Sequence, residues 1–209
     1  MESAPGRVKE TYTTGARSLA SRSVGGLART RVTPNALTTA GVTLCLAAAV
    51  IVPLEDREKL LYYWLGAAIF VLGSVLDILD GALARAGGRT TPFGAFLDST
   101  TDRVGEGAML AAITLVFARA GNATAAVATV AAVAGSFLVP YVRAKAEALG
   151  LRGDVGLGSR AERVVLITAG LVLAPWGVLP WAIVLLTATA WITVVQRVLS
   201  VRKQLHARR

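Results

Sequence analysis

The chain has 209 residues, of which 54% are hydrophobic and only 17% are charged, and its formal net charge is +9. Soluble chains carry about 25% charged residues, so this composition argues against both a disordered chain and a soluble globule. The single cysteine and single histidine exclude a disulfide framework, a zinc–cysteine cluster and a site of paired histidines. In so apolar a chain, the positive charge indicates cytoplasmic loops and contact with anionic lipid, and no nucleic-acid partner.

Six apolar runs suit helices that cross a bilayer, which takes about 20 residues each. We therefore predict an all-α, polytopic membrane protein with six transmembrane helices, at roughly residues 35–53, 60–83, 93–118, 122–142, 161–175 and 178–196. The residues before the first run are charged and contain no apolar core, so we expect no signal peptide.

The segment at residues 8–28 is too polar to span a bilayer, and its mixture of leucine, valine and basic residues predicts an N-terminal interfacial helix. A flexible basic tail is the alternative. The expected organisation is a cytoplasmic juxtamembrane helix over residues 1–33, a six-helix transmembrane domain over 34–200 and a cytoplasmic tail over 201–209.

Lysine and arginine set the expected orientation, because they gather on the cytoplasmic side of membrane proteins. With the N-terminus inside, the outside loops contain only Arg57, Lys59 and Arg119, and the other 19 of the 22 basic side chains are inside. We therefore expect a multi-pass protein of the cell (plasma) membrane with both termini in the cytoplasm.

Four carboxylates interrupt the second and third apolar runs: Asp77, Asp80, Asp98 and Asp102. An ionisable group inside a membrane span is costly and indicates function. Spacings of three and four residues place each pair on one helix face, and a short link lets the two faces meet. An all-oxygen cluster of this kind suits Mg²⁺ or Mn²⁺.

The alternative is that these acids pair with nearby arginines, which are Arg85, Arg89 and Arg103. Small residues beside the acids favour the metal site, because they let backbone and ligand approach closely. Asp77 lies eight residues before Arg85, or roughly 12 Å along a helix. We therefore expect the site to open near the cytoplasmic surface.

The complete string is Asp77-x2-Asp80-Gly81-x2-Ala84-Arg85-x8-Gly94-x3-Asp98-x3-Asp102. It resembles, without a gap or substitution, the signature of the CDP-alcohol phosphotransferase family. The resemblance implies a six-span fold, a homodimer formed through membrane helices and the transfer of a substituted phosphoryl group between CMP and an alcohol.

The resemblance also implies roles for the four acids. Asp77, Asp80 and Asp98 would bind two ions, Mg²⁺ with Mn²⁺ as a possible substitute, which would clamp the donor diphosphate. Asp102 resembles the family's catalytic base, would take the proton of the acceptor hydroxyl and would also contact the second ion. No serine or cysteine is placed to form a covalent intermediate.

The donor site is expected from matching family positions. Gly81 and Arg85 resemble residues that hold the donor nucleotide, and Thr91 begins the third span where its hydroxyl could face an anion. The stretch that resembles the cytidine side of the family's site comprises Asn35, Ala36, Leu37 and Thr38. Helix capping alone is the alternative for Thr91, and an ordinary helix start is the alternative for Asn35 to Thr38.

A second basic cluster, on the same side as the aspartates, comprises Arg143, Lys145, Arg160, Arg163 and Arg197. Fixed positive charge beside a phosphotransfer site suits a phosphorylated acceptor. This stretch is similar to the actinobacterial phosphatidylinositol phosphate synthases, and by that resemblance Arg143, Arg163 and Arg197 would hold the acceptor phosphate. Lys145 and Arg160 are weaker candidates. The alternative is positive charge that serves topology and lipid head groups alone.

The expected reaction is therefore transfer of a phosphatidyl group from CDP-diacylglycerol to inositol phosphate. The same chemistry on glycerol phosphate, serine or another alcohol is the alternative, and a neutral acceptor would have less need of three arginines. A divalent-cation transporter is a remote alternative. It predicts ligands near the bilayer midplane, whereas these aspartates lie toward one side.

Overall fold

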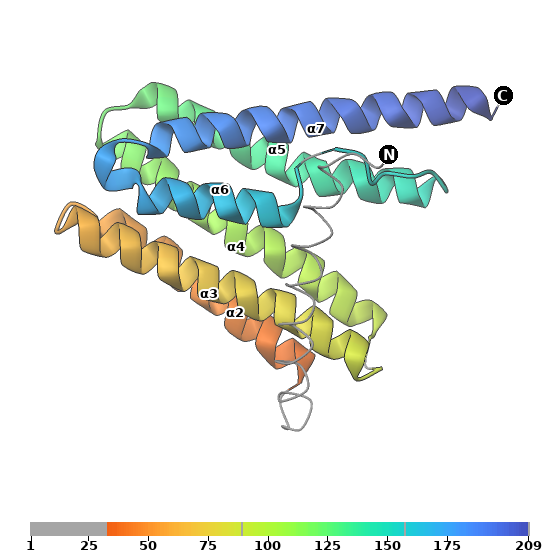
Figure 1. Cartoon of the computed structure of the whole chain (residues 1–209), viewed down its shortest axis with the longest axis horizontal. Helices are drawn as coiled ribbons and strands as arrows, with labels where there is room; N and C mark the ends of the chain where they lie inside the picture. The colour runs from red at the N-terminus through yellow and green to blue at the C-terminus, as the bar shows by residue number, and fades with distance from the viewer. Residues whose placement is uncertain (1–32, 89, 157, 209) are drawn as a thin grey trace, which may run out of the picture.

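The computed structural model describes residues 33–88, 90–156 and 158–208, and over these residues it contains helices and no strands (Figure 1). The all-α class is therefore confirmed. The expected interfacial helix lies outside the described residues. In chain order the elements are α2 Pro34–Ile51, the 3-10 turn η1 Val52–Leu54, α3 Lys59–Ala86, α4 Pro92–Arg119, α5 Ala123–Ala148, α6 Arg160–Val172, the 3-10 turn η2 Ala174–Trp176 and α7 Leu179–Ala207.

Four helical segments are long and apolar enough to cross a membrane: Pro34–Leu54, Lys59–Arg85, Ala123–Ala148 and Leu179–Ala207. The two other predicted spans correspond to α4 and α6. Helix α4 is long, but the aspartates and other charges lower its apolar character. Helix α6 has 13 residues, or roughly 20 Å, which is less than the ~30 Å hydrocarbon core. Four of the six predicted spans therefore meet the requirements by length and composition.

Two Thr-Pro pairs start the helices that carry the site. The Thr33 hydroxyl accepts a hydrogen bond from the Ala36 backbone N–H, and the Thr91 hydroxyl accepts one from the Gly94 N–H at 2.9 Å. Proline follows each threonine at the first position of the helix, where a backbone N–H would have no acceptor within the helix. The predicted start of the third run is therefore confirmed as a capped helix start.

Glycines bring α2 and α3 into backbone contact. A Cβ added to Gly73 of α3 would lie 2.7 Å from the Gly41 carbonyl oxygen of α2 and 2.8 Å from Cys45 Sγ. On α4, a Cβ added to Gly105 would lie 3.0 Å from Cys45 Cβ. Side chains larger than hydrogen at Gly41 or Gly73 would separate the two helices. This close packing holds the carboxylates of α3 and α4 near the start of α2.

Helix α6 lies between α3 and α7, while α5 packs along α7 (Figure 1). The apolar core runs between these helices and includes Phe70, Met109, Ile113 and Leu186, all of which are fully buried. The start of α6 lies beside α3 and α4 at the level of the aspartates, as its ion pairs with both helices show. The site is thus built by helices from both halves of the chain.

Candidate active site

Three of the four aspartates converge. Carboxylate oxygens of Asp77, Asp98 and Asp102 all lie within 4.8 Å of one another. Asp77 is buried, and the other two are partly exposed. Three oxygens at this separation are the hard ligands that Mg²⁺ and Mn²⁺ prefer. The predicted meeting of the two helix faces is therefore observed.

Asp80 lies beside this group and is held by α2. The Thr38 hydroxyl donates a hydrogen bond to Asp80 Oδ2, and Asp80 is only 3% exposed. Its other oxygen, Oδ1, is buried and has no hydrogen-bond partner in the described structure, and the same is true of Asp102 Oδ1. Buried carboxylate oxygens without a hydrogen bond are costly. Asp80 Oδ1 therefore fits a cation ligand, and Asp102 Oδ1 already attracts a cation, the Arg160 guanidinium 2.8 Å away. The donor set passes this test for a divalent metal.

Arg160 of α6 is the basic side chain that reaches the cluster. Its Nη1 contacts Asp77 Oδ2 and lies 2.8 Å from Asp102 Oδ1, although the latter contact lacks hydrogen-bond geometry. The ion pairs of the alternative interpretation, with Arg85 or Arg103, do not occur among the described residues, and its third arginine, Arg89, lies outside them. Among the described residues, the Arg160 guanidinium is the one that pairs with any of the four aspartates, so the cluster keeps excess negative charge.

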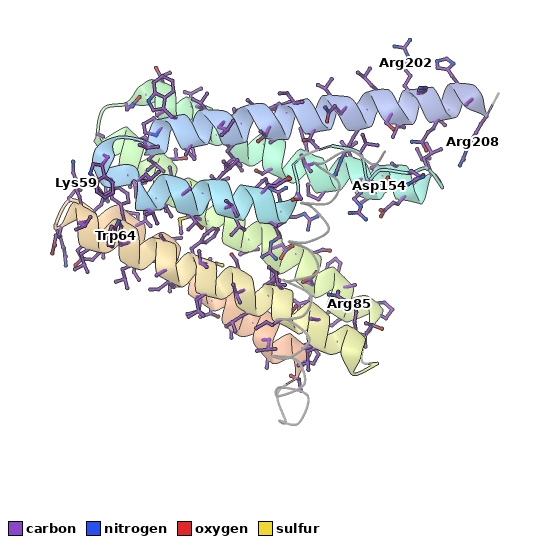
Figure 2. The ribbon with its side chains drawn as sticks, in the orientation of Figure 1. Lys59, Trp64, Arg85, Asp154, Arg202 and Arg208 are labelled. Carbon is purple, nitrogen blue, oxygen red and sulfur yellow. The ribbon has the colours of Figure 1, made fainter. Side chains whose placement is uncertain are left out.

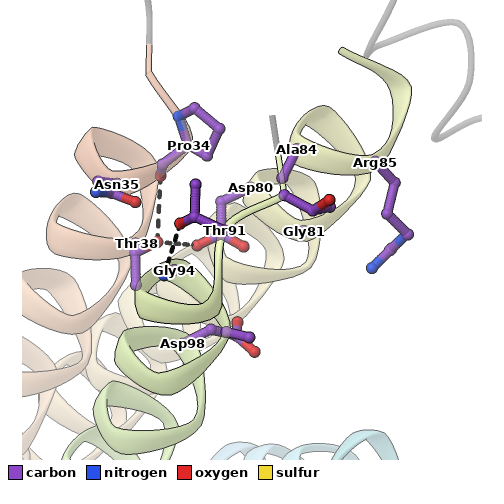
Figure 3. A pocket seen from close by; sticks show the side chains of 12 residues that line it. Pro34, Asn35, Thr38, Asp80, Gly81, Ala84, Arg85, Thr91, Gly94 and Asp98 are labelled. Atoms are coloured by element: carbon purple, nitrogen blue, oxygen red, sulfur yellow. Dashed lines mark hydrogen bonds between the residues drawn. The ribbon is translucent and has the colours of Figure 1, made fainter. Parts of the chain in front are cut away.

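A cavity of about 150 Å³ opens on one side of the aspartates, between the start of α2, the end of α3 and the start of α4 (Figure 3). Five of the seven predicted donor-binding residues line it: Asn35, Thr38, Gly81, Arg85 and Thr91. Asp80 and Asp98 form its inner wall. Ala36 and Leu37 are not among the lining residues.

The two glycines of the motif keep this cavity open. A Cβ added to Gly81 would lie 3.3 Å from Arg85 Nη1, and one added to Gly94 would lie 3.1 Å from Thr91 Oγ1. A methyl group at either position would therefore press on a side chain that lines the cavity. The Thr91 hydroxyl already caps α4, so its capping role is observed.

A second cavity, of about 290 Å³, has Asp102 in its wall and lies among α4, α5, α6 and α7. Four of the five predicted acceptor residues line it: Arg143, Arg160, Arg163 and Arg197. Asp102 forms part of the wall, whereas Asp98 lines the first cavity. The two cavities are therefore lined by carboxylates that lie one helical turn apart on α4.

Lys145 is the acceptor candidate that does not line this cavity. Its ammonium lies 5.9 Å from the centre of the Tyr141 ring, one turn earlier on α5. That distance suits a cation–π contact at the surface.

The four arginines are not equally free to bind an anion. Arg163 is 6% exposed and donates to both oxygens of Glu106, at 2.7 and 2.9 Å, and to the Gly158 carbonyl at 2.9 Å. Arg197 is 7% exposed, and its recorded partners are the backbone carbonyls of Val139 and Val155. No carboxylate neutralises Arg197 within the described parts of the chain. Its buried charge is therefore the one that most needs an anion.

One acid shares the second cavity with the arginines. Asp154 lies in the connection between α5 and α6 and lines the cavity. The pKa of Asp154 lies below its ordinary value, because its own backbone N–H donates to the carboxylate and Arg152 lies beside it. Asp154 is therefore ionised at neutral pH and can accept hydrogen bonds from hydroxyl groups.

An apolar groove begins beside the carboxylate cluster, at Arg160. It has a volume of about 800 Å³, lies between α3 and α6, and includes Val71, Ile78, Val164 and Val172 among its lining residues. Arg160 stands at its polar end and also contacts Asp77. The groove thus connects the carboxylate cluster to the apolar faces of two helices.

Comparisons with known proteins agree with this arrangement. The sequence profile of the CDP-alcohol phosphatidyltransferase family matches residues 31–196. The archaetidylinositol phosphate synthase of Methanothermobacter thermautotrophicus is 41% identical over 144 residues, which cover 67% of this chain and 71% of the relative. The phosphatidylinositol phosphate synthase of Mycolicibacterium smegmatis is 38% identical over 184 residues, which cover 86% of this chain and 78% of the relative.

Solved structures are similar as well. The Mycobacterium tuberculosis phosphatidylinositol phosphate synthase with CDP-DAG bound matches with a TM-score of 0.77 and 31% identity, covering 88% of this chain and 94% of its own. The same enzyme in complex with manganese and citrate matches with a TM-score of 0.75 and 32% identity, covering 87% and 88%. Together with the profile match over residues 31–196, these similarities show that the chain belongs to the CDP-alcohol phosphatidyltransferase family.

Proposed function

We propose that the protein is a phosphatidylinositol phosphate synthase that transfers the phosphatidyl group of CDP-diacylglycerol to inositol phosphate and releases CMP. The observation that carries the proposal is that one aspartate cluster contributes to the walls of two cavities. The first cavity lies among the motif residues of α2, α3 and α4, and the second is lined by four arginines. A donor and an anionic acceptor would thereby bind on opposite sides of the reacting phosphorus.

The donor nucleotide would occupy the first cavity. Arg85 offers a planar guanidinium for phosphate oxygens, and Gly81 and Gly94 leave room for the backbone to approach the diphosphate. The apolar groove between α3 and α6 suits the acyl chains, because it begins beside Asp77 and its wall is nearly all aliphatic. One end of the donor would thus lie in the polar site and the other in contact with lipid.

Asp77, Asp98 and Asp102 would hold divalent metal, together with Asp80 through its unpaired Oδ1. We propose two Mg²⁺ ions, with Mn²⁺ as a substitute. When bound, the metal supplies positive charge that neutralises the diphosphate and the charge developing on the leaving CMP. The carboxylates fix where that charge can lie.

Asp102 is the proposed general base. It lies in the wall of the acceptor cavity, so one of its oxygens can take the proton from the acceptor hydroxyl. The hydroxyl oxygen then forms a bond to the phosphorus that carries diacylglycerol. The bond from that phosphorus to the oxygen of CMP breaks, and CMP leaves with the electron pair. The protein forms no covalent bond to the substrate.

The acceptor phosphate would bind among Arg143, Arg160, Arg163 and Arg197. Arg197 contributes the charge that no carboxylate offsets in the described structure, and Arg143 lies at the exposed side of the cavity. The relatives named phosphatidylinositol phosphate synthase and archaetidylinositol phosphate synthase support inositol phosphate as the acceptor. Glycerol phosphate or another alcohol is the second candidate, because the arginines recognise phosphate and not the ring attached to it.

The membrane arrangement is proposed from the charge pattern. All six helices would lie in the membrane, and the catalytic unit would occupy residues 34–200. Both termini and the site would face the cytoplasm, where water-soluble inositol phosphate is available. By family resemblance, the protein would be a homodimer, which the mass of the detergent-solubilised particle would test.

Release of CMP tests the proposal. Purified protein with CDP-diacylglycerol and Mg²⁺ should release CMP when inositol phosphate is added, and should release little without it. In proteoliposomes, the cation-transporter alternative predicts Mn²⁺ flux in the absence of either substrate. CMP release without flux supports the proposed function, and flux without CMP release contradicts it.

A further inference from the structure

The C-terminal end of α7 is fastened to the connection between α5 and α6. Gln204 Oε1 accepts a hydrogen bond from the Arg152 backbone N–H at 2.9 Å, and Gln204 Nε2 donates to the Arg152 carbonyl at 2.8 Å. One side chain thus satisfies both backbone groups of one loop residue. Four residues further along, Arg208 Nη2 donates to the Gly150 carbonyl at 2.6 Å.

The same connection contacts α7 again nearer the site. Arg197 Nε donates to the Val155 carbonyl at 2.9 Å, and the Gly158 N–H donates to Thr193 Oγ1 at 3.0 Å. A Cβ added to Gly158 would lie 2.9 Å from Thr193 Oγ1. The loop backbone therefore lies directly on the helix at this end.

The four contacting residues of α7 lie on one face. At 3.6 residues per turn, Thr193, Arg197, Gln204 and Arg208 fall within an arc of about 60°. Arg202 falls on the opposite side of the helix. In Figure 2, Arg208 points toward the connection that carries Asp154, and Arg202 points away from it.

The fastened segment forms part of the second cavity. Asp154, Gly156, Gly158 and Ser159 all line that cavity, opposite the arginines of α5 and α7. Helix α7 has 29 residues, or roughly 43 Å, so its end extends beyond a ~30 Å hydrocarbon core. The last turns are therefore free to hold a loop at the membrane surface.

We propose that this face of α7 is a strap that sets the shape of the acceptor site, with Gln204 as a positioning residue for acceptor binding. The strap comprises Thr193, Arg197, Gln204 and Arg208. Gln204 does not line the cavity, and acts through the Arg152 backbone on Asp154 and the glycines that follow. This inference rests on the proposed function, because it assigns the second cavity to the acceptor.

The test compares Gln204→Ala with the wild-type protein in two measurements. Hydrogen exchange should become faster at the backbone amides of residues 150–156. The Michaelis constant for inositol phosphate should rise roughly five- to tenfold, because two neutral hydrogen bonds that order the loop are lost. The Michaelis constant for CDP-diacylglycerol should stay unchanged, since no residue of the strap lines the first cavity.

Two further variants make the test specific. Arg202→Ala is the matched control, because it removes charge from the opposite side of the same turns and should leave both measurements unchanged. Gln204→Glu keeps an oxygen for the Arg152 N–H and loses the donor to the Arg152 carbonyl, so its effects should be intermediate. If Gln204→Ala folds poorly, Gln204→Glu alone carries the comparison.

The inference would be overturned if Gln204→Ala showed faster hydrogen exchange but an unchanged Michaelis constant for inositol phosphate. Unchanged hydrogen exchange at residues 150–156 would also overturn it. Equal weakening of donor and acceptor binding would also overturn it, because that pattern indicates a general loss of stability. If wild-type protein uses a different phosphorylated alcohol, the same comparison is made with that acceptor. Failure of the proposed function therefore appears in the wild-type assay, and failure of the strap appears only in the variants.

Discussion

Arg163 of α6 and Glu106 of α4 form a buried ion pair closed by two hydrogen bonds of 2.7 and 2.9 Å. The residues are separated by 57 positions in the sequence, and both are almost fully buried. The pair joins α6 to the helix that carries Asp98 and Asp102, and fixes the Arg163 guanidinium in the wall of the second cavity.

We expect Glu106→Gln to destabilise the protein, because it leaves the Arg163 charge buried without its partner. Breaking a buried pair in this way costs about 3–5 kcal/mol. Unfolding in detergent measures the change. Glu147→Gln is the control, since the Arg143–Glu147 pair is half exposed and such pairs contribute about 0–1 kcal/mol. Equal stability of the two variants would show that the buried pair contributes no more to the stability of the fold than the exposed pair does.

Asp98→Asn should abolish activity and weaken Mn²⁺ binding, because it removes a charged oxygen from the three that converge. Asp77→Asn should do the same. Electron paramagnetic resonance of Mn²⁺ reports binding independently of turnover. Asp56→Asn, at an exposed acid in the link between α2 and α3, should change neither property. Full activity of Asp98→Asn, or full turnover in EDTA, would refute the metal site.

Asp102→Asn should bind CDP-diacylglycerol nearly as well as wild type and react more slowly. Loss of a general base lowers the rate by typically 10²–10⁴-fold. Single-turnover kinetics at saturating donor separate the chemical step from binding. A normal rate at saturating donor, combined with weak donor binding, would show that Asp102 acts mainly as a metal ligand.

Arg197→Ala should raise the Michaelis constant for inositol phosphate roughly 10–150-fold and leave that for CDP-diacylglycerol nearly unchanged. A charge-assisted hydrogen bond contributes about 1.5–3 kcal/mol, and Arg197 has no carboxylate partner in the described structure that would weaken its pull on an anion. Arg202→Ala is again the control. If both variants have the same constants, the basic cluster serves topology alone.

Arg163→Ala should have a larger effect than Arg197→Ala, in stability as well as in acceptor binding. It leaves the Glu106 carboxylate buried and unpaired in the wall of the acceptor cavity, where it would repel phosphate. The double variant Arg163→Ala/Glu106→Ala should recover much of the lost stability and part of the acceptor affinity. No recovery would show that the two side chains act independently.

Local patterns in the sequence were enough to predict the capped helix starts, the apolar helices and the convergence of the aspartates. Each of these depends on residues close in the chain or on a fixed helical period. The partner of Glu106 could not be predicted from such local patterns, because Arg103, its basic neighbour in the chain, does not pair with it. The Arg103 guanidinium instead donates to the Ser99 carbonyl, and Glu106 pairs with Arg163.

Other contacts at the site could not have been predicted, because they depend on how distant helices pack. Arg160 reaches Asp77 across 83 positions, and Gln204 reaches Arg152 across 52. The sequence offers only a basic residue and a polar residue near helix ends, and many positions share that description. Arg160 was predicted from the family resemblance as a weaker acceptor ligand, and the structure places it against the carboxylate cluster itself.

The most direct test of the account is the choice of acceptor. Purified protein is given CDP-diacylglycerol, Mg²⁺ and, in separate reactions, radiolabelled inositol phosphate, inositol, glycerol phosphate or serine, and labelled lipid is extracted and counted. The account predicts that inositol phosphate is converted to lipid fastest and that EDTA stops the reaction. Faster labelling from glycerol phosphate, serine or unphosphorylated inositol, or no labelled lipid from inositol phosphate, would contradict it.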